Sequence, residues 1–316
     1  MQLQHLGRYR LVAPLPVESS AWRMFTARLE DDPDPGSPAD ATPPSFVVKL
    51  MEPGRGGDGP GRRARFDHEV KLLTAANHPC IPTLHASGEQ DGVPYMVIDR
   101  VDGVSLATLC GHQDGASPRA LGKEIAVYVL GQLADAVRHL HEIEGEDGKL
   151  LDVVHRDLHP KIVVLSKAGD IMLADISTAR SRWLAREHDE PQVGALGYRA
   201  PERLLGDQVA TAQSDLFSLA VILWELLRGQ RCFVGDDASV RDAILKFEPA
   251  HPSRRVAGLS PKLGEILRKN LDRDPARRYA DAYQMLQRLA QAPEARAAEQ
   301  SREALAELVA SAGPPK

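Results

Sequence analysis

The segment from residue 153 to residue 176 constrains the fold more strongly than any other part of the chain. It reads VVHRDLHPKIVVLSKAGDIMLADI, and two short β-type runs, residues 162–165 and 171–174, flank a turn with the letters SKAGD. This pattern predicts a tight hairpin. Asp157 stands just before the first run and Asp175 just after the second. Because the open ends of a hairpin lie side by side, the sequence predicts that both carboxylates face one cleft.

The composition is that of an ordinary globular protein. The chain has 316 residues, of which 43% are hydrophobic and 26% charged, so it can bury a large core and is long enough for two lobes. Its net charge of −5 gives no basic face, and we therefore expect no nucleic-acid partner. The three cysteines lie far apart, which is typical of buried side chains in a reducing compartment.

The sequence has no pattern typical of export or membrane insertion. The opening MQLQHLGRYRLV lacks the basic-then-apolar order of a signal peptide. The densest apolar run, residues 216–227, is too short to cross a bilayer and contains Glu225. We therefore expect a cytoplasmic protein with no membrane attachment.

Residues 1–100 have the pattern of a small antiparallel sheet with one helix. Strand-like runs occur at residues 9–15, 22–28, 45–51, 83–87 and 94–98. A helical pattern begins at Ala64, and Glu69 lies on its apolar face. Two connectors rich in Pro, Gly and Asp, about residues 31–45 and 52–63, are predicted to be flexible insertions.

Residues 101–290 have mainly helical patterns and are predicted to form a second, larger lobe. An amphipathic helix is expected at 121–143, and Ser214-Asp215 is expected to cap an almost wholly apolar helix at 216–228. Further helices are predicted at 238–247, 261–271 and 279–290. Residues 291–316 form a third region, with an Ala/Glu/Arg-rich helix at 294–310 that is expected to be a solvated appendage.

A β-rich small lobe followed by a helical lobe with an HRD hairpin resembles the protein kinase family. The motifs are VVK (47–49), HRD (155–157), RAPE (199–202) and DPARR (274–278), in this order, and the likeness covers roughly residues 7–290. The stretches YMVIDRVDGVSL and GALGYRAPE are similar to bacterial serine/threonine kinases of the eukaryotic-like type. The resemblance implies an α+β, bilobal protein kinase fold.

The resemblance also implies ATP and Mg²⁺ as cofactors, and a protein substrate or signalling partner. Lys49 would contact the α- and β-phosphates, and Glu69 would hold the Lys49 ammonium as an ion pair. Asp157 would accept or orient the substrate hydroxyl proton, and Asp175 would bind Mg²⁺.

Other family positions concern adenine and the substrate side of the cleft. Ile98 occupies the gatekeeper position, and the backbone of Asp99 to Val101 would form the hinge that receives adenine. Glu202 and Arg278 would form a buried ion pair with a structural role.

Three departures from the family pattern affect phosphate and metal binding. Residues 16–22 contain no glycine where the phosphate-covering loop needs it, and Glu18 adds a negative charge there. Ile162 replaces the asparagine that holds a second Mg²⁺, and it has no donor atom. Ser177 replaces the glycine after Asp175-Ile176, whereas Ile176 can still fill the apolar position of the usual phenylalanine. Smaller departures are His159 for lysine and Ala195 for threonine.

Two functions therefore remain open from the sequence. The loss of two electrostatic stabilisers would cost on the order of 10⁴ in rate, which favours a pseudokinase that serves as a binding or scaffold module. The alternative is an active serine/threonine kinase that uses a single Mg²⁺ at Asp175. Neither the partner nor the oligomeric state follows from the sequence.

Several side chains near the hairpin have a simple structural interpretation as well as a functional one. The hydroxyls of Ser177, Thr178 and Ser181 could accept phosphate, with Arg156 to bind it, although unmodified loop hydroxyls are more common. His155 is expected to be a packed core residue and His159 to lie near the cleft surface. The spacing of the histidines at 139 and 141 in one helix does not suit a shared metal ion.

Overall fold

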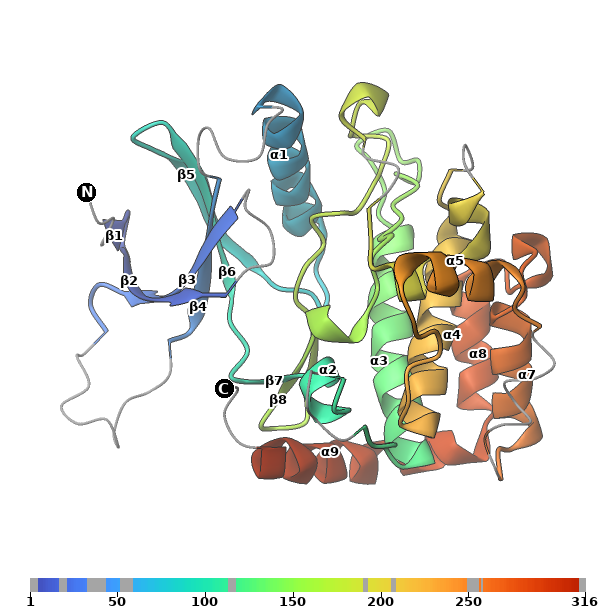
Figure 1. Cartoon of the computed structure of the whole chain (residues 1–316). Coiled ribbons are helices and arrows are strands. Elements are labelled where there is room, and N and C mark those ends of the chain that lie inside the picture. Colours follow the sequence, from blue (N-terminus) through green and yellow to red (C-terminus); the bar gives the residue numbers. More distant parts are fainter. Residues whose placement is uncertain are drawn as a thin grey trace.

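A six-stranded antiparallel sheet and one long helix form the amino-terminal lobe of the computed structural model, on the left in Figure 1. The sheet order is β1-β2-β3-β4-β6-β5. The elements are β1 (His5–Leu6), β2 (Tyr9–Leu15), β3 (Trp22–Leu29), β4 (Phe46–Met51), α1 (Gly59–Ala75), β5 (Leu84–Gln90) and β6 (Val93–Asp99). The structure describes residues 5–16, 22–32, 44–51, 59–112, 118–189, 193–205, 209–248, 256 and 258–312.

Side-chain alternation along β4 decides which residues face the rest of the protein. Val48 and Leu50 pack into a small core on the outer face of the sheet. Val47 and Met51 pack into the main core, which continues through α1 into the second lobe. Lys49, between them, therefore points inward and toward α1.

Helix α1 begins at Gly59, so the predicted flexible connector is wrong for residues 59–63. The first three residues of α1 are Gly-Pro-Gly, which the sequence pattern assigned to a loop. A helix nevertheless tolerates Pro in its first turn, because the N–H that Pro lacks has no partner within the helix there. The predicted connector residues 52–58, most of the predicted insertion at 31–45, and the predicted phosphate loop at 17–21, including Glu18, lie outside the described residues.

Helices dominate the carboxy-terminal lobe, on the right in Figure 1, and confirm the predicted α+β kinase-type fold. The helices are α2 (Leu106–Leu109), α3 (Lys123–His141), α4 (Ala212–Arg228), α5 (Asp237–Leu245), α7 (Pro261–Asn270), α8 (Ala282–Ala290) and α9 (Ala298–Ala312). Short 3₁₀ turns are η1 (Pro160–Ile162), η2 (Arg186–His188), η3 (Leu196–Tyr198), η4 (Pro201–Leu204), η5 (Pro275–Arg277) and η6 (Pro293–Ala297).

Helix α3 is the element on which this lobe is packed. Its stripe of Val129, Leu133, Val137 and Leu140 is completely buried, as its amphipathic pattern predicts. The helix contacts α4, α8 and α9 on its different sides. No helix in the described part of the chain is both long and apolar enough to cross a membrane.

The opening hairpin forms as predicted except at its open end, where Ile162 and Ala174 lie outside the two strands. Strands β8 (Val163–Ser166) and β9 (Ile171–Leu173) pair antiparallel, and β7 (Gly103–Ser105) pairs with β8 on the other side. Ile162, predicted to start the first strand, belongs instead to the 3₁₀ turn η1.

Helix α4 begins at Ala212 rather than at residue 216, so the predicted Ser214-Asp215 cap is wrong. Thr211 is the N-cap, and Ser214 completes a capping box with it. The apolar run that marked the helix in the sequence begins only after its first turn. The Asp215 side chain is therefore available for another role.

The Glu202–Arg278 ion pair predicted from the family resemblance is present. Two hydrogen bonds join the guanidinium to the carboxylate, at 2.7 and 2.8 Å, and both residues are 4% exposed. Arg278 also donates to the carbonyl oxygens of Asp272 and Gln213, so the pair joins the RAPE and DPARR motifs to the start of α4.

Helix α9 is packed against the lobe, so the expectation of a solvated appendage at 294–310 is wrong. It lies along the lower edge of the molecule in Figure 1 and contacts α3, α2 and β8. Leu305 is completely buried and Val309 is 3% exposed. Arg302 forms an ion pair of 2.7 Å with Asp170, in the β8–β9 turn, so α9 supports the hairpin from its closed end.

Shortening the buried side chain of Leu305 should weaken the whole fold. We expect Leu305→Ala to lower the free energy of unfolding by about 2–5 kcal/mol, because it leaves a cavity between α9 and α3. Glu303→Ala, on the exposed side of the same helix, should change it by less than about 0.5 kcal/mol. Urea unfolding followed by circular dichroism measures both values. Equal effects of the two substitutions would contradict the packing of α9.

Candidate functional site

The inward-facing Lys49 of β4 meets Glu69 of α1. The Lys49 Nζ atom lies 2.9 Å from Oε1 and 2.7 Å from Oε2 of Glu69, and the two side chains are 6% and 4% exposed. Burial by itself would lower the pKa of Lys49, but the charges of Glu69 and Asp175 outweigh it and raise the pKa above its ordinary value. The structure thus forms the predicted pair with a charged ammonium.

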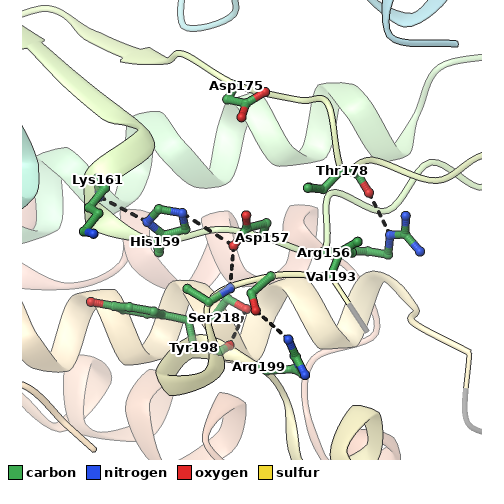
Figure 2. A network of polar contacts seen from close by, with 12 residues as sticks. Arg156, Asp157, His159, Lys161, Asp175, Thr178, Val193, Tyr198, Arg199 and Ser218 are labelled. Atoms are coloured by element: carbon green, nitrogen blue, oxygen red, sulfur yellow. Dashed lines mark hydrogen bonds and ion pairs between the residues drawn. The ribbon is translucent and has the colours of Figure 1, made fainter. Parts of the chain in front are cut away.

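The hairpin brings the two acids at its ends to the same side of the protein, as Figure 2 shows. The ring of His155, which is completely buried, joins them: its Nε2 atom lies 2.9 Å from the Asp175 carbonyl oxygen. Asp175 Oδ1 also lies 3.8 Å from Lys49 Nζ. The predicted residues of the two lobes therefore meet at one place.

Asp157 is held by two contacts to one of its carboxylate oxygen atoms (Figure 2). Its Oδ1 accepts a hydrogen bond of 2.7 Å from the Ala195 amide and lies 3.5 Å from His159 Nε2. Burial would raise the pKa of Asp157, but His159 and the Ala195 amide stabilise the charged form and lower it overall. Asp157 is thus a charged, oriented carboxylate, and His159 lies beside it as predicted.

Asp215 of α4 holds the backbone on which these residues stand, a role that sequence reasoning missed. Its two carboxylate oxygens accept hydrogen bonds from the amides of His155 (2.8 Å) and Arg156 (2.9 Å). These bonds support a strained backbone, because Arg156 has φ of +72°. The sequence contained a signal, an acid at the start of a fully apolar helix, but it pointed to a cap.

Kinases of this family hold Mg²⁺ through two side chains, and at most one of these two positions has a metal-binding side chain here. Asp175 has a carboxylate side chain that is 44% exposed, and its Oδ1 atom accepts a hydrogen bond of 2.9 Å from the Ser177 amide. Ile162, at the second position, packs against the main core and has no donor atom. Within the described ranges, no three His, Cys, Asp or Glu side chains gather in a way that could hold a metal ion.

The predicted gatekeeper and hinge residues lie at the end of strand β6 and directly after it. Ile98 is buried at 5% exposure. The Asp99 carboxylate accepts hydrogen bonds from the Thr83 amide (2.9 Å) and from His85 (2.6 Å), so it faces β5. The Asp99 side chain is therefore not turned to the cleft, and adenine binding by the backbone of residues 99–101 stays a prediction.

Trp22, in strand β3, is a second residue that sequence reasoning missed. Its ring centroid lies 4.7 Å from Lys49 Nζ, and the ring stacks on Phe66 of α1 at a centroid distance of 5.8 Å. The sequence showed only the absence of glycine there. The sequence alone does not say which side chain lies beside Lys49, because that depends on the register between β3 and β4.

The segment that connects Asp175 to the RAPE motif is held by an acid between two guanidinium groups. Asp189 Oδ1 lies 2.5 Å from Arg156 Nη1, and its Oδ2 lies 3.4 Å from Arg180 Nε. Phosphorylation commonly orders such segments by pairing with arginine. Residues 182–197 contain no Ser, Thr or Tyr. A carboxylate of the chain itself occupies that role here.

Two of the three hydroxyls predicted as possible phosphate acceptors, those of Thr178 and Ser181, form hydrogen bonds within the protein. Ser181 is 3% exposed, and its Oγ lies 2.7 Å from Nε2 of the buried His68. Thr178 donates from Oγ1 to the His155 carbonyl oxygen at 3.0 Å. Ser181 therefore serves as a buried contact between the segment and α1.

Comparison with known families matches residues 41–289 to the protein kinase domain. Three curated relatives are the serine/threonine-protein kinase PknB of Mycobacterium leprae, the probable serine/threonine-protein kinase SCO3848 of Streptomyces coelicolor and the serine/threonine-protein kinase PrkC of Bacillus subtilis. Their identities to the chain are 32%, 30% and 28%, over 70%, 72% and 70% of its length. The chain spans about a third of each relative, 34%, 33% and 32% respectively. It belongs to the protein kinase family, and the curated relatives that it resembles are serine/threonine-protein kinases of bacteria.

Removing the charge of Asp189 should loosen the segment. In Asp189→Asn we expect faster hydrogen–deuterium exchange and faster tryptic cleavage across residues 182–197. The reason is that a charge-assisted hydrogen bond to Arg156, typically worth about 1.5–3 kcal/mol, and a longer ion pair with Arg180 are both weakened. Asp242→Asn, which removes an exposed ion pair with Lys246, is the matched control and should leave the segment unchanged. Unchanged exchange in Asp189→Asn would show that other contacts order the segment.

Acidification should destabilise the protein through its buried histidines. Burial, with the nearby charge of Arg156, lowers the pKa of His68 to about 4, and burial lowers that of His112 to about 4. The unfolded chain, with an ordinary value of about 6.5, then binds more protons. The free energy of unfolding is therefore unaffected by these two histidines above pH 6.5, and it decreases as the pH falls from 6.5 toward 4.

His68→Gln isolates one part of this effect. Between pH 6 and 5, we expect the free energy of unfolding to fall about 1 kcal/mol less in this variant than in the wild type, because one of the histidines that resist protonation is gone. Urea titrations at both pH values give the slope. If the free energy of unfolding changed equally with pH in both proteins, His68 would be excluded as a cause of the acid sensitivity.

Proposed function

We propose that this chain is a serine/threonine-kinase-like signalling protein in which phosphotransfer is strongly weakened or absent, so that it acts as a pseudokinase or scaffold. The observation that carries the proposal is Ile162, whose hydrocarbon side chain packs against the core at the family position of a metal ligand. Phosphoryl transfer depends on compensating phosphate charge, and a lost electrostatic stabiliser costs about 10²–10³ in rate.

The contacts that order a kinase fold are nevertheless present, which supports a binding role over simple decay. Lys49 and Glu69 pair across the two elements that line the cleft. Asp215 holds the HRD backbone, and Asp189 holds the following segment. A scaffold needs a defined shape for its protein partner, and these contacts supply one without metal or phosphate.

The residue roles in this proposal follow the family positions. Lys49, Glu69 and Asp157 would be the catalytic set, and Asp175 the single metal ligand. Ile98, Asp99 and Val101 would line the adenine end. ATP and Mg²⁺ would bind weakly or not at all, since the second metal ligand is absent and Trp22 lies on Lys49. In this proposal, ATP and Mg²⁺ take part in no catalytic step.

Two observations favour the alternative of an active single-metal kinase. Asp175 has a half-exposed carboxylate within 3.8 Å of Lys49 Nζ, and Asp157 is charged and oriented. This alternative requires ATP and Mg²⁺ to bind, and transfer to depend on both Asp157 and Asp175.

A phosphotransfer assay separates the two functions. With radiolabelled ATP, Mg²⁺ or Mn²⁺ and casein, we expect label in casein and in the protein itself to be no higher for wild type than for Asp157→Asn. Transfer that disappears in Asp157→Asn and in Asp175→Asn would overturn the pseudokinase proposal. A shift in melting temperature with ATP, compared with Lys49→Ala, reports separately whether nucleotide binds without transfer.

A further inference from the structure

The ammonium of Lys49 is enclosed by groups of the protein itself. Glu69 contacts it through both carboxylate oxygens, and Asp175 Oδ1 lies 3.8 Å away. The ring of Trp22 covers it at 4.7 Å, a distance typical of a cation–π contact. With these neighbours, the Lys49 side chain is only 6% exposed.

The strand register gives Trp22 this position. In the antiparallel pairing of β3 with β4, Met24 is opposite Lys49 and Trp22 is opposite Met51. Side chains alternate along a strand, so Trp22 and Met24 share the inward face with Lys49. Phe66 of α1 stacks on the indole at an interplanar angle of 28° and supports it beside Lys49.

An indole and a phosphate cannot occupy this place together. A phosphate oxygen must approach an ammonium to about 2.7–2.9 Å to form a charge-assisted hydrogen bond. A ring in contact with the same ammonium excludes that approach from the side that the ring covers. Glycine is the residue that leaves such space open, since it has no side chain.

We propose that Trp22 is an internal ligand of Lys49 that fills the phosphate end of the cleft, so that a nucleoside triphosphate binds only when the indole is displaced. The inference rests on the proposed function in one respect, the assignment of Lys49 as the phosphate contact. It adds a residue that decides nucleotide access, independent of the missing metal ligand at Ile162.

Calorimetric titration of four proteins with ATP and with adenosine tests the inference. Trp22→Gly opens the space, Trp22→Leu keeps apolar bulk against Phe66 without a π face, and Trp22→Phe keeps an aromatic ring as the matched control. We expect Trp22→Gly and Trp22→Leu to bind ATP about 5- to 30-fold more tightly than wild type, the range that corresponds to losing such a contact. Trp22→Phe should stay within about threefold of wild type.

Adenosine distinguishes the phosphate end from general opening of the cleft. Because it has no phosphate, its affinity should be the same in all four proteins. Equal gains for ATP and adenosine would overturn the inference, and so would an unchanged ATP affinity in Trp22→Leu with wild-type circular dichroism. The Leu variant keeps the test decisive if Trp22→Gly does not fold.

The outcome is separate from that of the proposed function. If wild type transfers phosphate in the casein assay, the pseudokinase proposal fails, while the ratio of ATP affinities still decides on Trp22. If Trp22→Gly binds ATP more tightly but transfers no phosphate, both stand, because Ile162 still withholds the second metal ligand.

Discussion

The carboxylate of Asp215 is the contact on which the rest of the site depends. It is completely buried, and burial alone would raise its pKa; His141, His155 and the Arg156 amide stabilise its charge and lower the pKa overall. Two of these bonds hold the HRD backbone in a left-handed turn at Arg156. That turn sets where Asp157 points and allows the Arg156 guanidinium to reach Asp189. Without the carboxylate, both groups would lose their support.

The contacts that order the fold and the contacts that would serve phosphate chemistry have different requirements. Ion pairs such as Lys49–Glu69 and Glu202–Arg278 are satisfied within the protein and need no ligand. Phosphate and metal binding instead need groups that are left open toward the cleft. At two such places the chain has apolar side chains, Ile162 and Trp22. Under the proposed function, the protein keeps a kinase-like shape while these two side chains weaken nucleotide binding.

The errors of sequence reasoning share a physical cause. Hydrophobic periodicity marked where helices α1 and α4 become buried, but both begin about a turn earlier with polar or Gly-Pro residues. Helix α9 was expected in solvent because alanine-rich sequence has little apolar contrast, yet Leu305 and Val309 suffice to pack it on α3. In each case local composition predicted the helix, whereas packing decided its extent and place.

The sequence by itself determined the hairpin, the two acids at its ends, the pairing partners Lys49 and Glu69, and the isoleucine at a metal position. The hairpin and its two acids follow from short-range pattern. The roles of Lys49, Glu69 and Ile162 follow from the resemblance of the motifs to the protein kinase family. Only the tertiary structure decided that Trp22 covers Lys49, that Asp189 lies between Arg156 and Arg180, and that Asp215 holds the HRD backbone. Each of these joins elements distant in sequence, and such contacts depend on strand register and packing rather than on any local pattern.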